Sequence, residues 1–353
     1  MKKKTEYVVG GQGSWPASDI MKRRLLELWI FLWLLLPFGA YAFQVSVEFP
    51  KADSIAEQYP RHSLDDLKLL SGKLTASLST DEGKFRAIYK WVCLNIGNDY
   101  TLAEANRKNR AKLTGQELVA WNVKLMPMVH KKLIGQFSTV CTGYAWLIKE
   151  LATHAELQCE LVHGYGRTTQ ANIGGKGLLN HTWNAVKLDE KWYLCDATWS
   201  SGALNMETAS FVKNYEDSYF LARPEFFIRN HYPADNKWAL LDQLPTLDDF
   251  LNNPLIYVAA FKYNIQPLSP QRFIVTIEKG SKIDFQFTRP AGQQSNDVKL
   301  MVGSRDVRKA VDIENRGDVD VYSIGHTFAA RGTFAVHILI NDRPVVTYEV
   351  MVP

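Results

Sequence analysis

This chain has few cysteines and no recognisable metal-binding spacing. Its 353 residues include four cysteines, at positions 93, 141, 159 and 195. No Cys-x-x-Cys or His-x-x-x-His spacing occurs, and no EF-hand, Walker or dinucleotide-binding glycine pattern is completed. The sequence therefore predicts no metal site and no cofactor. No spacing selects a disulfide pair, so Cys93, Cys159 and Cys195 are expected to be small buried hydrophobic residues.

A large excess of one charge is also missing. The chain holds 41 Lys and Arg against 37 Asp and Glu. Residues 1–42 contain six of the basic and three of the acidic residues, so subtraction leaves 35 basic and 34 acidic residues from position 43 onward. No basic stripe with interleaved aromatic residues occurs either. These features exclude a nucleic acid as the expected partner.

One long hydrophobic run does occur, close to the start of the chain. Lys22-Arg23-Arg24 is a positive segment, residues 25–36 are almost continuously apolar, and Ala40-Tyr41-Ala42 has the small-x-small pattern of a cleavage site. We predict a signal peptide at 21–42 and an exported protein, periplasmic or secreted. The alternative is an uncleaved N-terminal membrane anchor, and membrane contact is expected only in that case.

Cys141 lies at the front edge of a segment that is expected to be helical. Tyr144, Leu147, Ile148 and Leu151 have the spacing of one buried helical face. A cysteine in the first turn of a helix lies near the positive end of the helix dipole and near unpaired backbone N–H groups. Both favour the thiolate over the thiol, whose unperturbed pKa is about 8.5. The position therefore suits a nucleophile.

His181 and Asp196 belong to a predicted antiparallel hairpin. Residues 180–188 and 191–199 are rich in β-branched and aromatic side chains, and Asp189-Glu190 separates them. If this pair forms a two-residue turn, His181 and Asp196 become diagonal neighbours on one face of the sheet, about 7–8 Å apart at the backbone. A turn with an odd number of residues would place them on opposite faces. We predict the two-residue turn.

Four stretches with this order and spacing form a specific combination. They are Ala87–Ile96, Cys141–Ala145, His181–Val186 and Trp192–Trp199. Together they resemble the transglutaminase-like superfamily, a branch of the papain-like cysteine-nucleophile fold. Residues 219–241 are similar to its kyphoscoliosis-peptidase-like branch. The resemblance covers residues 76–250. Val140 departs from it, because relatives usually carry a small residue, commonly glycine, before the nucleophile.

The resemblance implies a catalytic triad of Cys141, His181 and Asp196, and each residue type suits its role. The thiolate attacks an amide carbonyl and forms a thioester, the imidazole accepts and returns the proton, and the carboxylate orients the imidazole. The backbone N–H of Cys141 is one expected donor to the oxyanion. The second donor stays open among three upstream residues: Gln116, Trp121 and Gln136.

Three functions are compatible with such a site. Water as acceptor gives a peptidase or amidase, an amine gives a cross-linking transglutaminase, and a scaffold protein could keep the fold without turnover. The resemblance favours the hydrolase, with a protein or peptide as substrate. The oligomeric state is not fixed by the sequence.

The domain organisation follows from changes in composition and hydrophobic pattern along the chain. We predict an over-extended start at 1–20 before an initiator Met21, the signal peptide at 21–42, a helical lead-in at 43–75, a transglutaminase-like catalytic domain at 76–263 and a β-sandwich domain at 264–353. The fold class is α+β. A papain/transglutaminase-like core, with the nucleophile helix packed on an antiparallel sheet, is followed by an immunoglobulin-like β-sandwich. Asn264–Pro270 is the expected linker, and the basic segment 108–112 is expected to be a solvated face.

Overall fold

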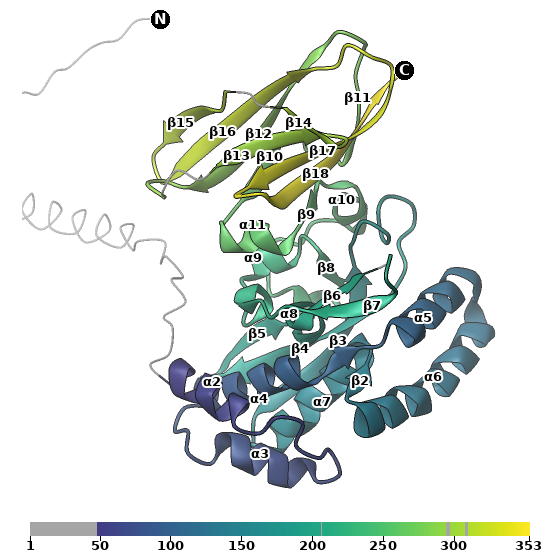
Figure 1. Cartoon of the computed structure of the whole chain (residues 1–353), viewed down its shortest axis with the longest axis vertical. Coiled ribbons are helices and arrows are strands. Elements are labelled where there is room, and N and C mark those ends of the chain that lie inside the picture. The colour runs from purple at the N-terminus through teal and green to yellow at the C-terminus, as the bar shows by residue number, and fades with distance from the viewer. Residues whose placement is uncertain (1–47, 206, 294–296, 308–309) are drawn as a thin grey trace, which may run out of the picture. The chain divides into compact units, whose positions relative to one another are not determined.

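The computed structural model describes residues 48–205, 207–293, 297–307 and 310–353 (Figure 1). The predicted start and signal peptide lie outside these residues, as do the first five residues of the predicted lead-in. Within the described part of the chain, no helix is both long enough and apolar enough to cross a membrane.

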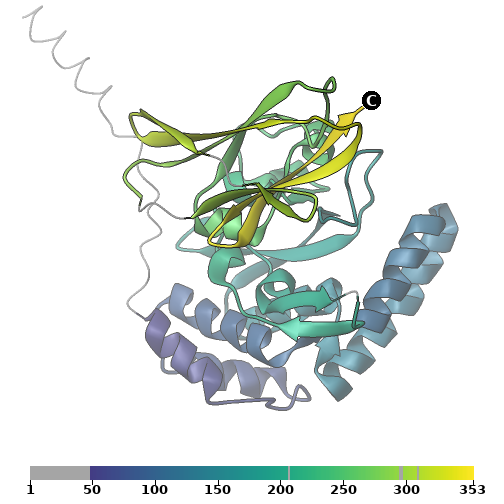
Figure 2. The same ribbon diagram turned by 45° about the horizontal axis from the view of Figure 1, so that its top comes forward.

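Helices dominate the first part of the described chain. They are α2 (Phe49–Glu57), α3 (Leu67–Thr75), α4 (Asp81–Asn95), α5 (Tyr100–Lys112), α6 (Gly115–Gln136) and α7 (Cys141–His154). Helix α4 begins after Thr80, whose hydroxyl accepts a hydrogen bond from the backbone N–H of Gly83 (3.0 Å). The apolar faces of α2, α3, α4 and α7 share one buried cluster. Helices α5 and α6 run side by side as a separate pair (Figures 1 and 2).

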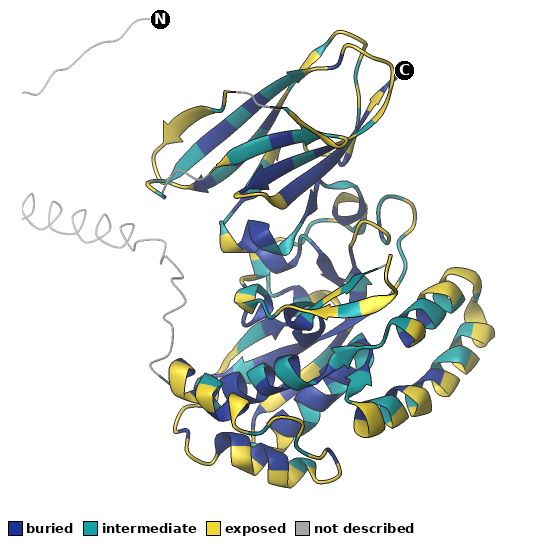
Figure 3. Ribbon diagram, viewed as in Figure 1, coloured by how far each residue is buried: buried dark blue, intermediate teal, exposed yellow. Residues whose placement is uncertain are grey.

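An antiparallel sheet of four strands carries the central part of the fold. Its strands are β3 (Gln158–Gly166), β4 (His181–Leu188), β5 (Lys191–Cys195) and β8 (His231–Pro233), in the order β5-β4-β3-β8. Helix α7 packs on β3 and β4. Buried residues therefore fill β4 almost completely (Figure 3). The expected packing of the helix that begins at Cys141 on an antiparallel sheet is confirmed.

The hairpin between β4 and β5 has the predicted register. Leu188 pairs with Lys191, and the ladder continues to Asn184 opposite Cys195. Asp189 and Glu190 form the turn, with φ of 46° and 63°, the two left-handed positions that match the twist of a tight hairpin. The predicted second strand is too long, however. It ends at Cys195, because Asp196 leaves the ladder and caps a short helix.

Short elements surround this sheet. They are the parallel pair β1 (Gly97–Asn98) and β2 (Ser138–Thr139), α8 (Ala197–Ser201), the hairpin β6 (Gly202–Asn205) and β7 (Ser210–Lys213), η1 (Asp217–Tyr219), α9 (Pro224–Phe227), η2 (Asn236–Ala239), α10 (Leu247–Asn252) and α11 (Val258–Lys262). The β1–β2 pair matters for the site, because it brings Asn98 beside Thr139, two residues before Cys141.

Two further sheets form the C-terminal part of the chain. One has the order β10-β12-β16-β15 and the other β11-β18-β17-β13-β14, with β9 also paired to β18. The strands are β9 (Leu255–Ile256), β10 (Gln266–Ser269), β11 (Ile274–Thr276), β12 (Lys282–Pro290), β13 (Val298–Val302), β14 (Arg305–Val307), β15 (Asp312–Arg316), β16 (Val319–Thr327), β17 (Gly332–Ile340) and β18 (Arg343–Val352). Phe285 and Tyr348 join the two sheets, with ring centroids 5.1 Å apart. The expected linker is wrong in part, since β10 occupies most of it and pairs with β12.

Candidate active site

Cys141 is the first residue of α7, where the sequence predicts it. It is partly exposed, and Val140 before it is buried. The carbonyl oxygen of Val140 accepts the backbone N–H groups of Gly143 (2.8 Å) and Tyr144 (3.1 Å), which starts the helix. A Cβ on Gly143 would lie 2.0 Å from the Thr139 hydroxyl oxygen, so only glycine lets the helix start this close to β2. The backbone N–H of Cys141 itself has no acceptor within the helix.

His181 and Asp196 meet directly. His181 Nε2 lies 2.7 Å from Asp196 Oδ2. The other carboxylate oxygen of Asp196 accepts the backbone N–H groups of Thr198 (2.8 Å) and Trp199 (3.2 Å), so the residue also caps α8. Cys141 and His181 line the same cavity and shift each other's pKa values. Because its Nε2 faces the carboxylate, Nδ1 is the nitrogen left for the sulfur.

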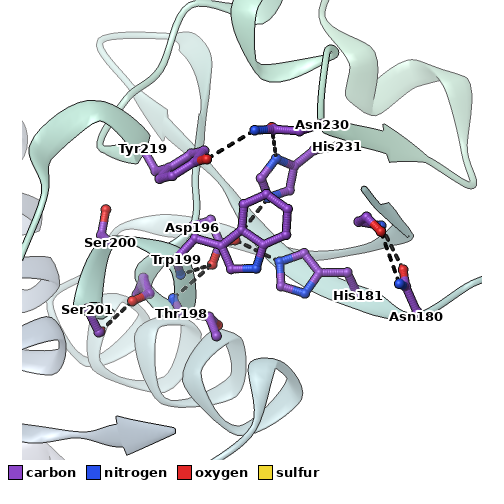
Figure 4. A network of polar contacts seen from close by, with 12 residues as sticks. Asn180, His181, Asp196, Thr198, Trp199, Ser200, Ser201, Tyr219, Asn230 and His231 are labelled. Atoms are coloured by element: carbon purple, nitrogen blue, oxygen red, sulfur yellow. Dashed lines mark hydrogen bonds and ion pairs between the residues drawn. The ribbon is translucent and has the colours of Figure 1, made fainter. Parts of the chain in front are cut away.

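The environment of His181 fixes its ring from two sides. The indole of Trp199 stacks on the imidazole, with centroids 4.9 Å apart (Figure 4). On the adjacent strand, a Cβ on Gly166 would lie 2.8 Å from the Cβ of His181. A residue larger than glycine at 166 would therefore push the histidine away from its partners.

The three groups shift one another's pKa values. Burial raises the pKa of the Cys141 thiol, but the hydrogen bond and positive charge of His181 outweigh this and hold that pKa below its ordinary value. Burial lowers the pKa of His181, yet Asp196 and Cys141 raise it to about 10. Burial also raises the pKa of Asp196, while His181 and His231 hold it far below its usual range. These shifts favour the ion pair of thiolate and imidazolium, beside a carboxylate, over the neutral pair of thiol and imidazole.

A second histidine completes the cluster, and the sequence analysis did not identify it. His231 Nε2 lies 2.9 Å from the same Asp196 oxygen that binds His181 (Figure 4). Its Nδ1 is 2.6 Å from Asn230 Oδ1, and Asn230 Nδ2 donates to the Tyr219 hydroxyl (3.0 Å). Its only signal in the sequence was its place within the family-like segment 219–241.

His231 differs from His181 in charge. Burial lowers the pKa of His231 to about 4, against the opposing effect of Asp196. A neutral ring that donates from Nε2 has a lone pair at Nδ1, which accepts a hydrogen bond. The Asn230 amide supplies this donor if its nitrogen and oxygen are exchanged, and its oxygen then accepts from the Tyr219 hydroxyl. Since His231 is then uncharged, it adds a hydrogen bond to Asp196 and leaves the negative charge for His181.

Among the residues with described positions, His181, Asp196 and His231 are the group that could hold a metal ion, with ligand atoms within 4.8 Å of one another. Both Nε2 atoms, however, point at one carboxylate oxygen over 2.7 and 2.9 Å. These are hydrogen-bond lengths to an acceptor, and a metal would have to replace both bonds. Hydrogen bonding accounts for the arrangement.

A cavity of about 370 Å³ adjoins the thiol. Cys141, His181 and Trp199 line it, together with residues of the segment 168–180 and of α5. Arg110 of α5 lines the cavity, so the expectation that 108–112 is wholly solvated is wrong at this residue.

None of the three candidates for the second oxyanion donor lines this cavity. Gln116 and Gln136 are exposed, and the indole N–H of Trp121 donates to Asn106 Oδ1 (3.0 Å). Asn98 does line it, and its buried Oδ1 has no hydrogen-bond partner among the described residues. The pairing of β1 with β2 brings Asn98 here, which no local pattern could predict.

The remaining cysteines behave as predicted. Cys93, Cys159 and Cys195 are buried and free of disulfides. Burial raises the pKa of Cys159 to about 12 and those of Cys93 and Cys195 further. Among the four cysteines, only Cys141 has a lowered pKa.

Fold and site thus define a protein with a cysteine-histidine-aspartate cluster, the cysteine at a helix start and the histidine on an antiparallel sheet. Residues 68–197, which contain all three side chains, match the family described as the transglutaminase-like superfamily. These residues therefore form a transglutaminase-like domain.

Individual relatives cover the chain to different extents. It is similar to the human Kyphoscoliosis peptidase, with 30% identity over 298 residues, covering 78% of this chain and 42% of that protein. The mouse Kyphoscoliosis peptidase is 31% identical over 58% of this chain and 28% of its own length. Hillarin of Drosophila melanogaster is 25% identical over 62% of this chain and 26% of its own. The chain therefore spans less than half the length of these relatives.

Proposed function

We propose that this protein is an exported cysteine hydrolase that cleaves amide bonds in proteins or peptides. The observation that carries the proposal is the position of His181, whose Nε2 lies 2.7 Å from the Asp196 carboxylate and whose side chain lines the same cavity as Cys141. In this arrangement Cys141 is the nucleophile, His181 the general acid and base, and Asp196 the orienting group.

The reaction follows from the charges of the three groups. The Cys141 thiolate attacks the carbonyl carbon, and the C=O electron pair moves to the oxygen. His181, as imidazolium, gives its Nδ1 proton to the leaving amine as the C–N bond breaks, which leaves a thioester. A water molecule then attacks the thioester while neutral His181 accepts its proton. Collapse of that adduct releases the carboxylic acid and the thiolate.

The oxyanion needs two hydrogen-bond donors in this scheme. The backbone N–H of Cys141 is one, because a residue at a helix start has no intrahelical acceptor. We assign the side-chain amide of Asn98 as the second. It lines the cavity and makes no hydrogen bond to another described residue, so its N–H groups are available to a substrate oxygen.

Hydrolysis is favoured over transamidation because the human and mouse relatives are both named Kyphoscoliosis peptidase. Export is supported by the composition of residues 21–42, with membrane anchoring as its alternative. The substrate is a protein or peptide. The two C-terminal sheets are assigned as an immunoglobulin-like sandwich because they are largely antiparallel and share one apolar core.

The test of the enzyme is the rate at which iodoacetamide alkylates the purified protein across pH. We expect fast modification of Cys141 well below about pH 8.5, the pKa of an ordinary thiol. His181→Ala should lose this enhancement, and Cys141→Ala should not be modified in the native state because the other cysteines are buried. Alkylation no faster than that of an unfolded cysteine, with the same rate in His181→Ala, would establish the non-catalytic scaffold instead.

The fate of the thioester needs a separate experiment. A glutamine-bearing protein is incubated with the enzyme and a labelled primary amine. Cleavage or deamidation without labelling is the expected result. Incorporation of the amine without cleavage would show that the protein is a cross-linking transglutaminase.

A further inference from the structure

The cavity beside Cys141 is lined by a charge that no described acidic group neutralises. Arg110 is on α5 and lines the same cavity as Cys141 and His181. Its guanidinium donates to three neutral acceptors: Asn106 Oδ1 (3.0 Å), Asn122 Oδ1 (2.8 Å) and the carbonyl oxygen of Leu179 (3.2 Å). An arginine side chain has five N–H donors, so three are used and two remain.

The neighbouring arginine on the same helix shows what a compensated charge looks like. Arg107 binds Glu104 through two hydrogen bonds, of 2.8 and 2.9 Å. Arg110 lies about one turn further along and makes no such pair within the described part of the chain. A half-buried guanidinium without a counter-ion costs free energy, and a bound anion would offset that cost for Arg110.

The rest of the cavity does not supply the missing negative charge. Its described lining residues include Arg107 and Arg110 and no aspartate or glutamate. On β3, His163 interacts with Arg110, and burial and Arg110 both lower its pKa. An imidazole is neutral or positive, so it cannot supply a negative charge. Cys141 and Arg110 do interact electrostatically. The thiolate, however, is already paired with His181.

We infer that Arg110 determines specificity for substrates that carry a carboxylate close to the scissile bond. Its two remaining N–H groups can bind the two oxygens of a carboxylate, the geometry for which a guanidinium is best suited. The carboxylate belongs to an acidic side chain or to the C-terminus of the peptide. The inference rests on the proposed function, since it concerns the substrate of the same site.

Two alkylating reagents of nearly equal size separate the inference from the proposed function. Iodoacetate is an anion and iodoacetamide is neutral, and both react with the same Cys141 thiolate. We expect the ratio of their rates to be higher for this protein than for glutathione. Arg110→Gln should lower the ratio about three- to tenfold at low ionic strength, and added salt should reduce the difference.

Two further variants keep this result interpretable. Lys108→Gln removes the same charge from an exposed residue of the same helix and should leave the ratio within about twofold of wild type, because that charge is solvent-screened. Arg110→Lys keeps the charge but not the planar fork, and should retain most of the ratio. An unchanged ratio in Arg110→Gln overturns the inference. Slow reaction of the wild type with neutral iodoacetamide would instead overturn the proposal that the protein is an enzyme.

The source of the carboxylate is resolved with matched peptides, each compared for wild type and Arg110→Gln by kcat/KM. One peptide has an internal glutamate and an amidated C-terminus, a second has glutamine in its place and a free C-terminus, and a third has neither carboxylate. Preference for the first identifies an acidic side chain, and preference for the second a C-terminal carboxylate. In either case Arg110→Gln should remove the preference. Equal cleavage of all three would refute the inference while leaving the hydrolase intact.

Discussion

The core around Asp196 and the core between the two C-terminal sheets are built in opposite ways. Around Asp196, the buried side chains of His181, Asn230 and His231 are polar and form a connected set of hydrogen bonds. Between the sheets, the buried residues are largely apolar, as in the fully buried Ile338. Burial of polar groups costs free energy unless they are paired, whereas burial of apolar groups stabilises the fold directly.

The polar region around Asp196 sets protonation states, whereas the apolar region between the sheets contributes stability. In the polar core, neighbouring groups have pKa values shifted in opposite directions, because Asp196 and Cys141 raise the pKa of His181 whereas burial lowers that of His231. Such shifts concentrate where a site needs a defined protonation state. In the apolar core, the side chains contribute packing and hydrophobic free energy. Substitutions in the two regions should therefore change different measurable quantities.

Asp196→Asn should have the largest effect on reactivity. Asparagine is a good N-cap, so α8 and the fold should be kept, but it cannot stabilise an imidazolium. We expect the alkylation rate of Cys141 at neutral pH to fall about 100-fold or more. Circular dichroism checks the fold. A variant that is folded and reacts like wild type would show that Asp196 is not the orienting group.

His231→Leu should have a smaller effect of the same kind. It removes one hydrogen bond to a charged carboxylate, which is worth about 1.5–3 kcal/mol, so we expect alkylation to slow about tenfold or somewhat more. The pH at which alkylation begins should also rise, because Asp196 then stabilises the imidazolium less well. His231→Gln, which still offers an N–H donor, serves as the matched control. If both variants react alike and like wild type, His231 has only a packing role.

The two histidines should change stability with pH in opposite directions. The pKa of His231 is lowered to about 4, so its contribution to stability is present above about pH 6.5 and lost as the pH falls towards 4. The pKa of His181 is raised to about 10, so its contribution is present below about pH 6.5 and lost as the pH rises towards 10.

Urea unfolding across pH measures both limbs, with effects on the order of 1–3 kcal/mol. Cys141→Ser is the background, because thiolate formation would change stability in the opposite sense above the lowered pKa of Cys141. His231→Gln should flatten the acid limb and His181→Gln the alkaline limb. Unchanged limbs in these variants would show that other groups control the pH dependence.

Ile338→Ala should have the smallest effect on reactivity and a large one on stability. Removing a fully buried aliphatic side chain typically costs about 2–5 kcal/mol. The alkylation rate of the folded protein should stay within about twofold of wild type, since Ile338 lies on β17, which carries none of the reactive groups. A marked loss of reactivity with the fold retained would mean that the two cores are coupled.

Much of the site was predictable from local sequence patterns. The helical spacing after Cys141 fixed the start of α7, and the two-residue turn at Asp189-Glu190 fixed the register of the hairpin. The end of β5 was missed, because Asp196 accepts the backbone N–H groups of Thr198 and Trp199. A capping aspartate and a strand aspartate look alike in sequence when aromatic residues follow.

Gly164 and Gly166 illustrate what tertiary contacts add. As a sequence motif they suggest a phosphate-binding loop, although an incomplete one. In the fold, Gly166 pairs with His231 on β8, and Gly164 pairs with His181 on β4. Their missing side chains leave room for His181, Trp183 and the backbone of Tyr232. Their role is steric, and it depends on strands that lie far apart in the sequence.

The sequence by itself determined the local positions of Cys141 and His181, because a helix start and a tight hairpin are local structures set by residues a few positions apart. Only the tertiary structure decided which other side chains join them. Asn98, Arg110 and His231 come from elements that sheet pairing and helix packing bring to the site, and such contacts leave no periodic pattern in the chain. Charge balance in the cavity is a property of that assembly, since it depends on which ionised groups lie within a few ångström of one another and which do not.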